Sequence, residues 1–167
     1  WSSDVCSSDL MKTLVVYVSN RGYTRECAQQ IAAIIGSGSI AVEVGREAAA
    51  HDIADYEAVI LGAGIHAGRL SGKFRSWCTK HTQELLKTKL GLFICANDEA
   101  NQEKLFEANY PPELLKHAMA RGYLGGRIIM SDYNFIIKAI LKRIAGSGDD
   151  VHLEKPDNVK ALAAQFA

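Results

Sequence analysis

The sequence lacks long hydrophobic runs and lacks an excess of charge of either sign. No apolar stretch approaches the length of about 18 residues that a membrane-spanning helix needs, and there is no secretory signal pattern. Lysine plus arginine (19) balances aspartate plus glutamate (19). This balance disfavours a nucleic-acid-binding protein, because affinity for phosphate backbones needs concentrated positive charge. We expect a soluble, cytoplasmic protein.

Cysteine is too scattered for a disulfide framework or a metal centre. Beyond residue 10 the cysteines are Cys27, Cys78 and Cys95, which are far apart and form no Cys-x-x-Cys pair. The 5 histidines show no metal-ligand spacing either. We expect reduced, largely buried thiols and no metal site.

Glycine (14) and proline (3) are few, and hydrophobic residues make up 48% of the 167 residues. This composition excludes collagen-like, coiled-coil and mainly disordered chains, and the length predicts one domain. Residues 1–10, WSSDVCSSDL, have no helical or strand period and resemble translated sequencing-adapter sequence. We expect 1–10 to be a non-native or disordered leader, Met11 to be the true start, and 11–167 to form the domain.

Short apolar runs alternate with amphipathic stretches from Met11 onward. The expected strands are 13–18, 40–44, 58–61, 90–96 and 121–130, the last interrupted at Gly125 and Gly126. The expected helices are 24–35, 73–86, 103–108, a segment after Pro112, 135–144 and a final one from Pro156. Because parallel strands need crossover connections, this alternation predicts an α/β fold with helices on both faces of a parallel sheet. Ligands bind such sheets beyond the carboxyl ends of the strands, so we expect function in the loops after the first, third and fourth strands.

The loop from Ser19 to Thr24 (SNRGYT) has the chemistry of a phosphate site. It joins the first strand directly to a helix, with hydroxyl groups at both ends and Gly22 two places before the helix. Free N–H groups at a helix N-terminus and hydroxyl donors both suit a phosphate. Arg21 either adds a positive charge or points into water. The alternative is a threonine N-cap with a turn glycine, which needs no ligand.

The loop from Gly62 to Ala67 (GAGIHA) fits the dinucleotide fingerprint G-x-G-x-x-[GA]. That fingerprint needs an acidic residue about 20 residues on, at the end of the next strand. Asp98 is the first acid at that strand end and lies much farther along, while Glu84 falls inside a predicted helix. We therefore do not expect a nicotinamide site here.

The segment from Tyr17 to Thr24 resembles the FMN-phosphate loop of flavodoxins, whose pattern is [ST]-x-[ST]-G-x-[ST]. Ser19, Gly22 and Thr24 match this pattern, and Arg21 replaces the middle hydroxyl. The likeness continues through 61–65 with Gly68 and through 123–127, and covers essentially all of 11–167. The later stretches resemble the flavodoxin-domain group that includes the menaquinone-dependent protoporphyrinogen IX dehydrogenases of bacterial haem synthesis.

The resemblance implies a flavodoxin-like, doubly wound five-stranded parallel sheet of order 2-1-3-4-5 that binds FMN. It implies no particular catalytic residue. The cofactor-binding residues that it implies are Ser19, Asn20, Arg21, Gly22, Tyr23, Thr24, Ala63, Gly64, Ile65, His66, Gly68, Asn97 and Asp98.

In a flavodoxin-like fold the loops after strands three and four lie against the flavin ring. A peptide beside the flavin N5 atom can rotate when N5 gains a proton, which can require the positive φ that glycine tolerates. Gly62, Gly64 or Gly68 could supply that peptide, or these glycines only form a tight turn. His66 faces the ring or is an exposed loop histidine. Asn97 bonds the pyrimidine edge or belongs to a turn.

Neither of these two loops offers an obvious aromatic residue to stack on the flavin. Tyr23, Trp77 and Tyr110 are candidates by fold alone. Trp77 lies on the apolar face of its predicted helix, so we expect it to pack in the core.

The predicted helix within 134–145 is apolar nearly all round except for Lys138, Lys142 and Arg143. We favour a helix packed on the sheet with a narrow solvated edge. The alternative is peripheral contact with an anionic membrane surface through the basic stripe.

The leading function hypothesis is an FMN redox protein, either an electron carrier or an oxidoreductase. Classical flavodoxin carriers are strongly acidic, whereas this chain has no net charge. An enzyme of the protoporphyrinogen dehydrogenase type, with a quinone or porphyrin-type substrate, fits the later motifs. Those enzymes carry a long basic insertion after the fourth strand, whereas the segment here is shorter and begins acidic. The alternative is a cofactor-free binding or regulatory module on a flavodoxin scaffold. The sequence makes no prediction of oligomeric state.

Overall fold

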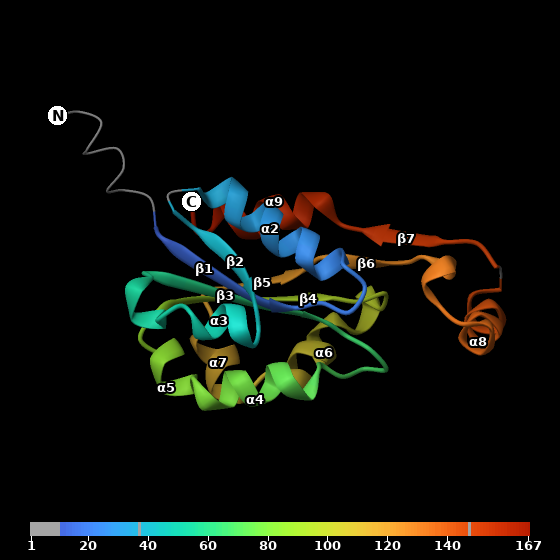
Figure 1. Ribbon diagram of the computed structural model, residues 1–167, viewed down its shortest axis with the longest axis horizontal. Helices are drawn as coiled ribbons and strands as arrows, with labels where there is room; N and C mark the ends of the chain where they lie inside the picture. The colour runs from blue at the N-terminus through green and yellow to red at the C-terminus, as the bar shows by residue number, and fades with distance from the viewer. Residues whose placement is uncertain (1–10, 37, 147) are drawn as a thin grey trace.

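A five-stranded parallel sheet forms the centre of the molecule (Figure 1). The computed structural model describes residues 11–36, 38–146 and 148–167, so the expected leader 1–10 lies outside the described residues. The strands are β1 (Thr13–Val18), β2 (Ile40–Glu43), β3 (Ala58–Gly64), β4 (Lys89–Cys95) and β5 (Ala120–Tyr123). Their order, β2-β1-β3-β4-β5, confirms the doubly wound arrangement expected from the sequence. In register, Val16 of β1 lies between Val42 of β2 and Leu61 of β3.

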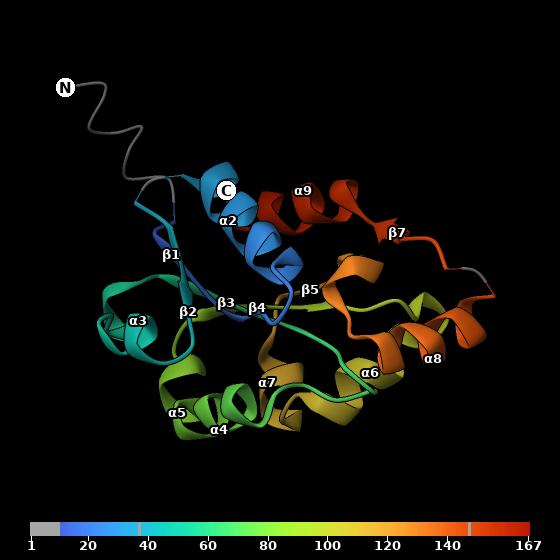
Figure 2. The same ribbon diagram turned by 45° about the vertical axis from the view of Figure 1, so that its right-hand side comes forward.

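Helices cover both faces of the sheet (Figures 1 and 2). One face carries α2 (Tyr23–Ile35) and α9 (Pro156–Ala164). The other face carries α3 (Arg46–Ala49), α4 (Gly72–Lys80), α5 (Thr82–Leu85), α6 (Gln102–Asn109) and α7 (Pro112–His117). Single turns of 3₁₀-helix occur at η1 (Ile53–Asp55), η2 (Glu99–Asn101) and η3 (Met130–Asp132).

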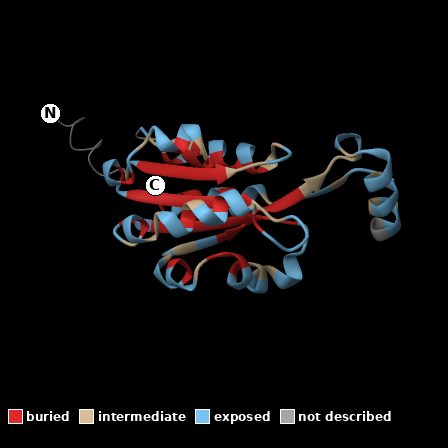
Figure 3. Cartoon of the chain, turned by 60° about the horizontal axis from the view of Figure 1, so that its bottom comes forward, coloured by how far each residue is buried: buried red, intermediate tan, exposed pale blue. Residues whose placement is uncertain are grey.

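The core consists of two apolar layers, one on each face of the sheet, as the burial colouring of Figure 3 shows. Successive side chains of a strand point to opposite faces, so Leu14 and Val16 enter one layer and Val15 and Tyr17 the other. Both layers therefore draw on β1, and burial on both faces explains its unbroken apolar sequence.

The single predicted helix 73–86 is wrong, because the structure divides it at His81 into α4 and α5. The hydroxyl groups of Thr79 and Thr82 donate to the carbonyls four residues earlier, those of Arg75 and Cys78. Bonds of this kind bend helices, which gives a physical reason for the break.

The predicted strand 121–130 is also wrong beyond Tyr123. The chain leaves the main sheet at Leu124 and forms β6 (Gly125–Ile128), which pairs antiparallel with β7 (Val151–Glu154). The turn away from the sheet is possible because Gly125 has φ +70°, a conformation that other residues rarely adopt. We call residues 125–154 the arm; it consists of β6, η3, α8 (Phe135–Ala145) and β7.

Helix α8 does not pack on the sheet, so the favoured interpretation of this segment is wrong. Phe135 is 85% exposed and Ile136 is 69% exposed. Figures 1 and 3 show α8 at the end of the arm, away from the helices that cover the sheet. Its apolar composition is therefore not explained by burial within this chain.

Cys27, Cys78 and Cys95 are free and buried, as expected. Within the described ranges no cluster of three or more histidine, cysteine or acidic side chains could hold a metal ion. In the same part of the chain, no helix is long and apolar enough to cross a membrane.

Candidate flavin-binding site

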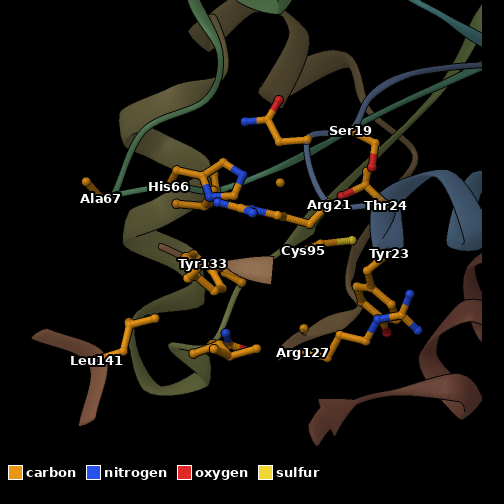
Figure 4. Close-up of a pocket in the computed structure, with 17 residues that line it drawn as sticks. Ser19, Arg21, Tyr23, Thr24, His66, Ala67, Cys95, Arg127, Tyr133 and Leu141 are labelled. Carbon is orange, nitrogen blue, oxygen red and sulfur yellow. The ribbon is translucent and has the colours of Figure 1, made fainter. Parts of the chain in front are cut away.

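A pocket of about 330 Å³ opens at the carboxyl ends of β1, β3 and β4 (Figure 4). This is the sheet edge at which doubly wound folds bind ligands, and the volume lies within the range of about 300–1,000 Å³ for ligand pockets. Its wall consists of Ser19, Asn20, Arg21, Tyr23, Thr24, Gly64, Ile65, His66, Ala67, Cys95, Ala96, Asn97, Gly126, Arg127, Ile128, Tyr133 and Leu141. The three loops expected from the sequence therefore meet in one pocket.

The loop between β1 and α2 presents unpaired donors to the pocket. Gly22, at φ +92°, is the N-cap of α2, and the N–H of Glu26 donates to its carbonyl at 3.0 Å. The N–H groups of the first helical turn before Glu26 have no partner within the helix. The hydroxyl of Ser19 accepts from the N–H of Gly22 at 3.0 Å, which leaves its own proton free to donate. The threonine N-cap interpretation is wrong, because Gly22 takes that position and no side chain caps the helix.

Arg21 lies on the pocket wall and joins the loop to the arm, rather than pointing into water. Its guanidinium donates to the carbonyl of Asp132 and lies 4.1 Å from the ring centroid of Tyr133. Its positive charge adds to the positive end of the α2 dipole. The pocket therefore has an electropositive end suited to an anion.

The glycines after β3 differ in what surrounds them. A Cβ at Gly62 would lie 1.9 Å from the Phe93 ring, so Gly62 belongs to the core. Gly64 lines the pocket, and a Cβ there would lie 3.2 Å from Thr24 Oγ1. Gly68 is outside the wall, where its carbonyl accepts from Asn109 at 3.0 Å. Of the three glycines, Gly64 alone lines the pocket.

The tight-turn interpretation is confirmed at Gly68, which forms a turn together with Ala67. His66 and Arg69 exchange two backbone hydrogen bonds of 3.0 and 3.1 Å across these residues. Both turn residues have positive φ, +51° for Ala67 and +77° for Gly68, as a two-residue type I′ turn requires. Alanine in this conformation is strained by contact between its Cβ and the backbone.

Replacing Ala67 with glycine is therefore expected to stabilise the protein by about 0.5–1 kcal/mol. The matched control is Ala33→Gly at an exposed position inside α2, which should destabilise by a similar amount. Urea denaturation of both variants measures this difference. Equal losses in the two variants would show that Ala67 is not strained.

His66 lies at the exposed rim of the pocket, on its wall. Partial loss of water around its ring, and secondly the positive charge of Arg21, lower its pKa below the ordinary value. The imidazole is therefore mainly neutral at pH 7. It can donate or accept a hydrogen bond without adding charge.

The third part of the wall follows β4. Gly126 of the arm packs so tightly here that a Cβ would lie 2.5 Å from Asn97 Oδ1. The N–H of Ala96 donates to the carbonyl of Gly125 at 2.9 Å, which attaches the arm to this loop. Burial raises the pKa of the Cys95 thiol well above its ordinary value, so the pocket faces a neutral thiol there.

Two aromatic side chains line the pocket, Tyr23 and Tyr133. The hydroxyl of Tyr23 donates to the carbonyl of Leu124 at 2.6 Å, and Arg127 lies 5.4 Å from its ring centroid. Trp77 packs against the core, as expected. Tyr110 is buried and donates to the carbonyl of Phe93 at 2.8 Å. Trp77 and Tyr110 therefore lie outside the pocket.

Four residues predicted for the site lie off the wall. Gly22 caps α2 and Gly68 belongs to the turn described above. Ala63 is fully buried in the core. The carboxylate of Asp98 accepts from the side-chain amide of Asn101 at 3.0 Å. The other predicted residues line the pocket.

The prediction missed wall residues of the arm above all. Gly126 and Arg127 fall within 123–127, one of the stretches that resemble the flavodoxin family. That resemblance could have identified them as site residues. Arg127 bonds Glu26 of α2 at 2.9 Å. Tyr133 and Leu141 gave no signal, because only the folding back of the arm brings them to the pocket. Ile128, which follows Arg127 in the arm, was also missed. The remaining missed residues, which lie close to predicted ones along the chain, are Ala67, Cys95 and Ala96.

A family model described as a flavodoxin domain matches residues 14–152, and the chain belongs to this family. A short-chain flavodoxin associated with a PDU bacterial microcompartment matches with a TM-score of 0.56 and 13% identity, over 93% of this chain and 97% of that chain. The flavodoxin of Streptococcus pneumonia TIGR4 matches with a TM-score of 0.50 and 13% identity, over 92% and 93% of the two chains. These structural matches establish the fold. No significant match was found among curated proteins.

Proposed function

We propose that this protein binds FMN in the pocket and acts as a redox protein. The observation that carries the proposal is the anion cradle at the N-terminus of α2, which opens directly into the pocket. Helix N-termini with free N–H groups and hydroxyl donors bind phosphate, and membership of the flavodoxin domain family supports the same ligand.

In this proposal the phosphate lies at the first turn of α2. Ser19 and Thr24 supply hydroxyl donors, and Arg21 supplies positive charge in place of a third hydroxyl. Gly64 and Gly126 keep two sides of the pocket free of side chains, which suits a flat ring. When bound, the flavin supplies one- and two-electron chemistry, while the residues around it set its position and exclude water.

The experiment that tests the proposal is the visible spectrum of the purified protein before and after FMN is added, with a fluorescence titration. Flavin absorption bands and quenched fluorescence on titration are the expected result. Protein that stays colourless and leaves FMN fluorescence unchanged would contradict the proposal. A cofactor-free binding or regulatory module would then be the leading function hypothesis.

The double variant Ser19→Ala/Thr24→Ala is expected to weaken FMN binding by at least about 100-fold, because each hydroxyl donates to a charged phosphate. Affinity for riboflavin, which lacks the phosphate, should change little. Fluorescence titrations with both ligands measure this. The matched control is Ser76→Ala/Thr79→Ala on the exposed side of α4, which should bind FMN normally. Equal losses for FMN and riboflavin would place the phosphate elsewhere.

An oxidoreductase of the menaquinone-dependent protoporphyrinogen IX dehydrogenase type is a second candidate. The observation that favours it over a simple carrier is the arm, which places Tyr133 and Leu141 on the pocket wall. Apolar wall residues of this kind suit a large, flat, apolar substrate. Protoporphyrinogen oxidation by the FMN-loaded protein with a quinone acceptor tests this candidate, and no turnover above the rate with free FMN would exclude it.

A further inference from the structure

Helix α8 carries large apolar side chains that this chain leaves in water. Phe135 is 85% exposed, Ile136 69% and Ile140 52%. Ile136 and Ile140 are one helical turn apart, so they lie on the same side of the helix. Contiguous exposed apolar side chains on a soluble protein mark an interaction site.

The helix is complete without a partner. At its start, the N-cap Asn134 accepts from the N–H of Ile137 at 2.9 Å. At its end, Gly146 adopts a left-handed conformation and donates to the carbonyl of Lys142 at 3.0 Å. Both ends are capped locally, so the arm presents a formed amphipathic helix.

The charges on α8 are all positive. Lys138, Lys142 and Arg143 lie on the helix, which has no acidic residue. The acidic residues of the arm, Asp132, Asp149, Asp150 and Glu154, lie outside the helix, and Glu154 pairs with Arg127. The carboxylate of Asp150 is engaged by the N–H of Met130 at 2.7 Å.

We propose that α8 docks on an anionic lipid surface, with Phe135, Ile136 and Ile140 inserted at the acyl-chain boundary. Lys142 and Arg143 lie on the same side in the last turns of the helix, and their long side chains extend to the headgroups. A short helix with an apolar side and basic residues is the form that lies in the plane of a membrane interface. Basic residues near an anionic leaflet add electrostatic attraction to the free energy gained by burying apolar side chains.

A second copy of the chain fits this surface less well. Two α8 helices packed about a two-fold axis would bring the same basic residues together, with no acidic residue on either helix to pair with them. Lipid phosphates supply the negative charge that such a pair lacks.

Docking through α8 would bring the pocket to the lipid surface. The root of the arm is held by the Arg127–Glu26 pair and by Arg21, which donates to the carbonyl of Asp132. Leu141 of α8 lines the pocket itself. The surface that meets lipid and the surface that faces the pocket therefore belong to one short helix.

Co-sedimentation of the full chain with vesicles tests the proposal. We expect binding to equimolar phosphatidylcholine and phosphatidylglycerol, weak binding to phosphatidylcholine alone, and loss of binding as salt is raised toward about 0.5 M. Phe135→Ser/Ile140→Ser and Lys142→Gln/Arg143→Gln should each weaken binding to the anionic vesicles by about tenfold or more.

Matched controls separate the role of α8 from general effects of the changes. Ile34→Ser/Met119→Ser removes apolar side chains that are 45% and 48% exposed elsewhere, and should bind vesicles normally. Lys104→Gln/Lys160→Gln removes two exposed charges outside the arm, and should also bind normally. Far-UV circular dichroism confirms that each variant is folded.

Three outcomes would overturn the proposal. The first is no sedimentation with either vesicle, and the second is binding that the α8 variants leave unchanged. The third is a dimer in light scattering that dissociates in Phe135→Ser/Ile140→Ser, which would assign the exposed surface to a second copy. None of these outcomes depends on whether the pocket holds FMN.

Discussion

Gly125→Ala is expected to lower the free energy of unfolding by about 3 kcal/mol or more. Gly125 has φ +70°, and a Cβ there would lie 1.9 Å from the carbonyl oxygen of Leu153. That oxygen belongs to the backbone of β7, so it cannot move away as a flexible side chain can. The expected loss combines a strained backbone with separation of β6 from β7. Urea denaturation measures the change.

Gly146→Ala is the control that separates strain from crowding. Gly146 has nearly the same φ, +75°, but a Cβ there would meet no atom within 4 Å. This variant should lose only about 1 kcal/mol, the cost of a left-handed alanine. A loss at Gly125 no larger than the loss at Gly146 would show that the β6–β7 approach is not a constraint on the fold.

Gly64→Leu is expected to lower FMN affinity by about 100-fold or more while the protein stays folded. A Cβ at Gly64 would already lie 3.2 Å from Thr24 Oγ1 and 3.4 Å from His66 Nε2. The rest of a leucine side chain would extend into the space proposed for the flavin, and crowding of this kind costs about 1–3 kcal/mol or more when the neighbours cannot move. Fluorescence titration with FMN measures the loss.

Gly72→Leu makes the same chemical change away from the pocket. Gly72 is exposed at the start of α4, and a Cβ there would meet nothing within 4 Å. This variant should bind FMN with normal affinity. Normal binding by Gly64→Leu would mean that the ligand does not approach β3, and the proposed position of the ring would be wrong.

The fold was predictable from the sequence where local pattern and burial agree. The β1 sequence (TLVVYV) is buried on both faces, and its apolar run predicted a central strand. The order of the strands followed from the family resemblance. The break at His81 was not predictable, because it depends on hydroxyl bonds of Thr79 and Thr82 that the helical period does not show.

The candidate site was predictable only where it is built from loops that follow a strand. Ser19 and Gly64 were found because each lies at the carboxyl end of a strand. Tyr133 was missed, because the arm brings it back to Arg21 across more than a hundred residues of sequence. The helical period of residues 135–144 correctly predicted a helix. The apolar composition of this helix did not predict whether the rest of the chain buries its side chains.

The arm begins and ends at one point of the main sheet. The N–H of Lys155 donates to the carbonyl of Leu124 at 3.2 Å, so the chain returns to the point from which it left. The entropy of closing a loop grows only slowly with its length, and insertions and deletions are best tolerated where the two ends already meet. Evolution can therefore lengthen, shorten or exchange this excursion at small thermodynamic cost. Such exchanges would alter which molecules reach the pocket while the N-terminus of α2 stays the same.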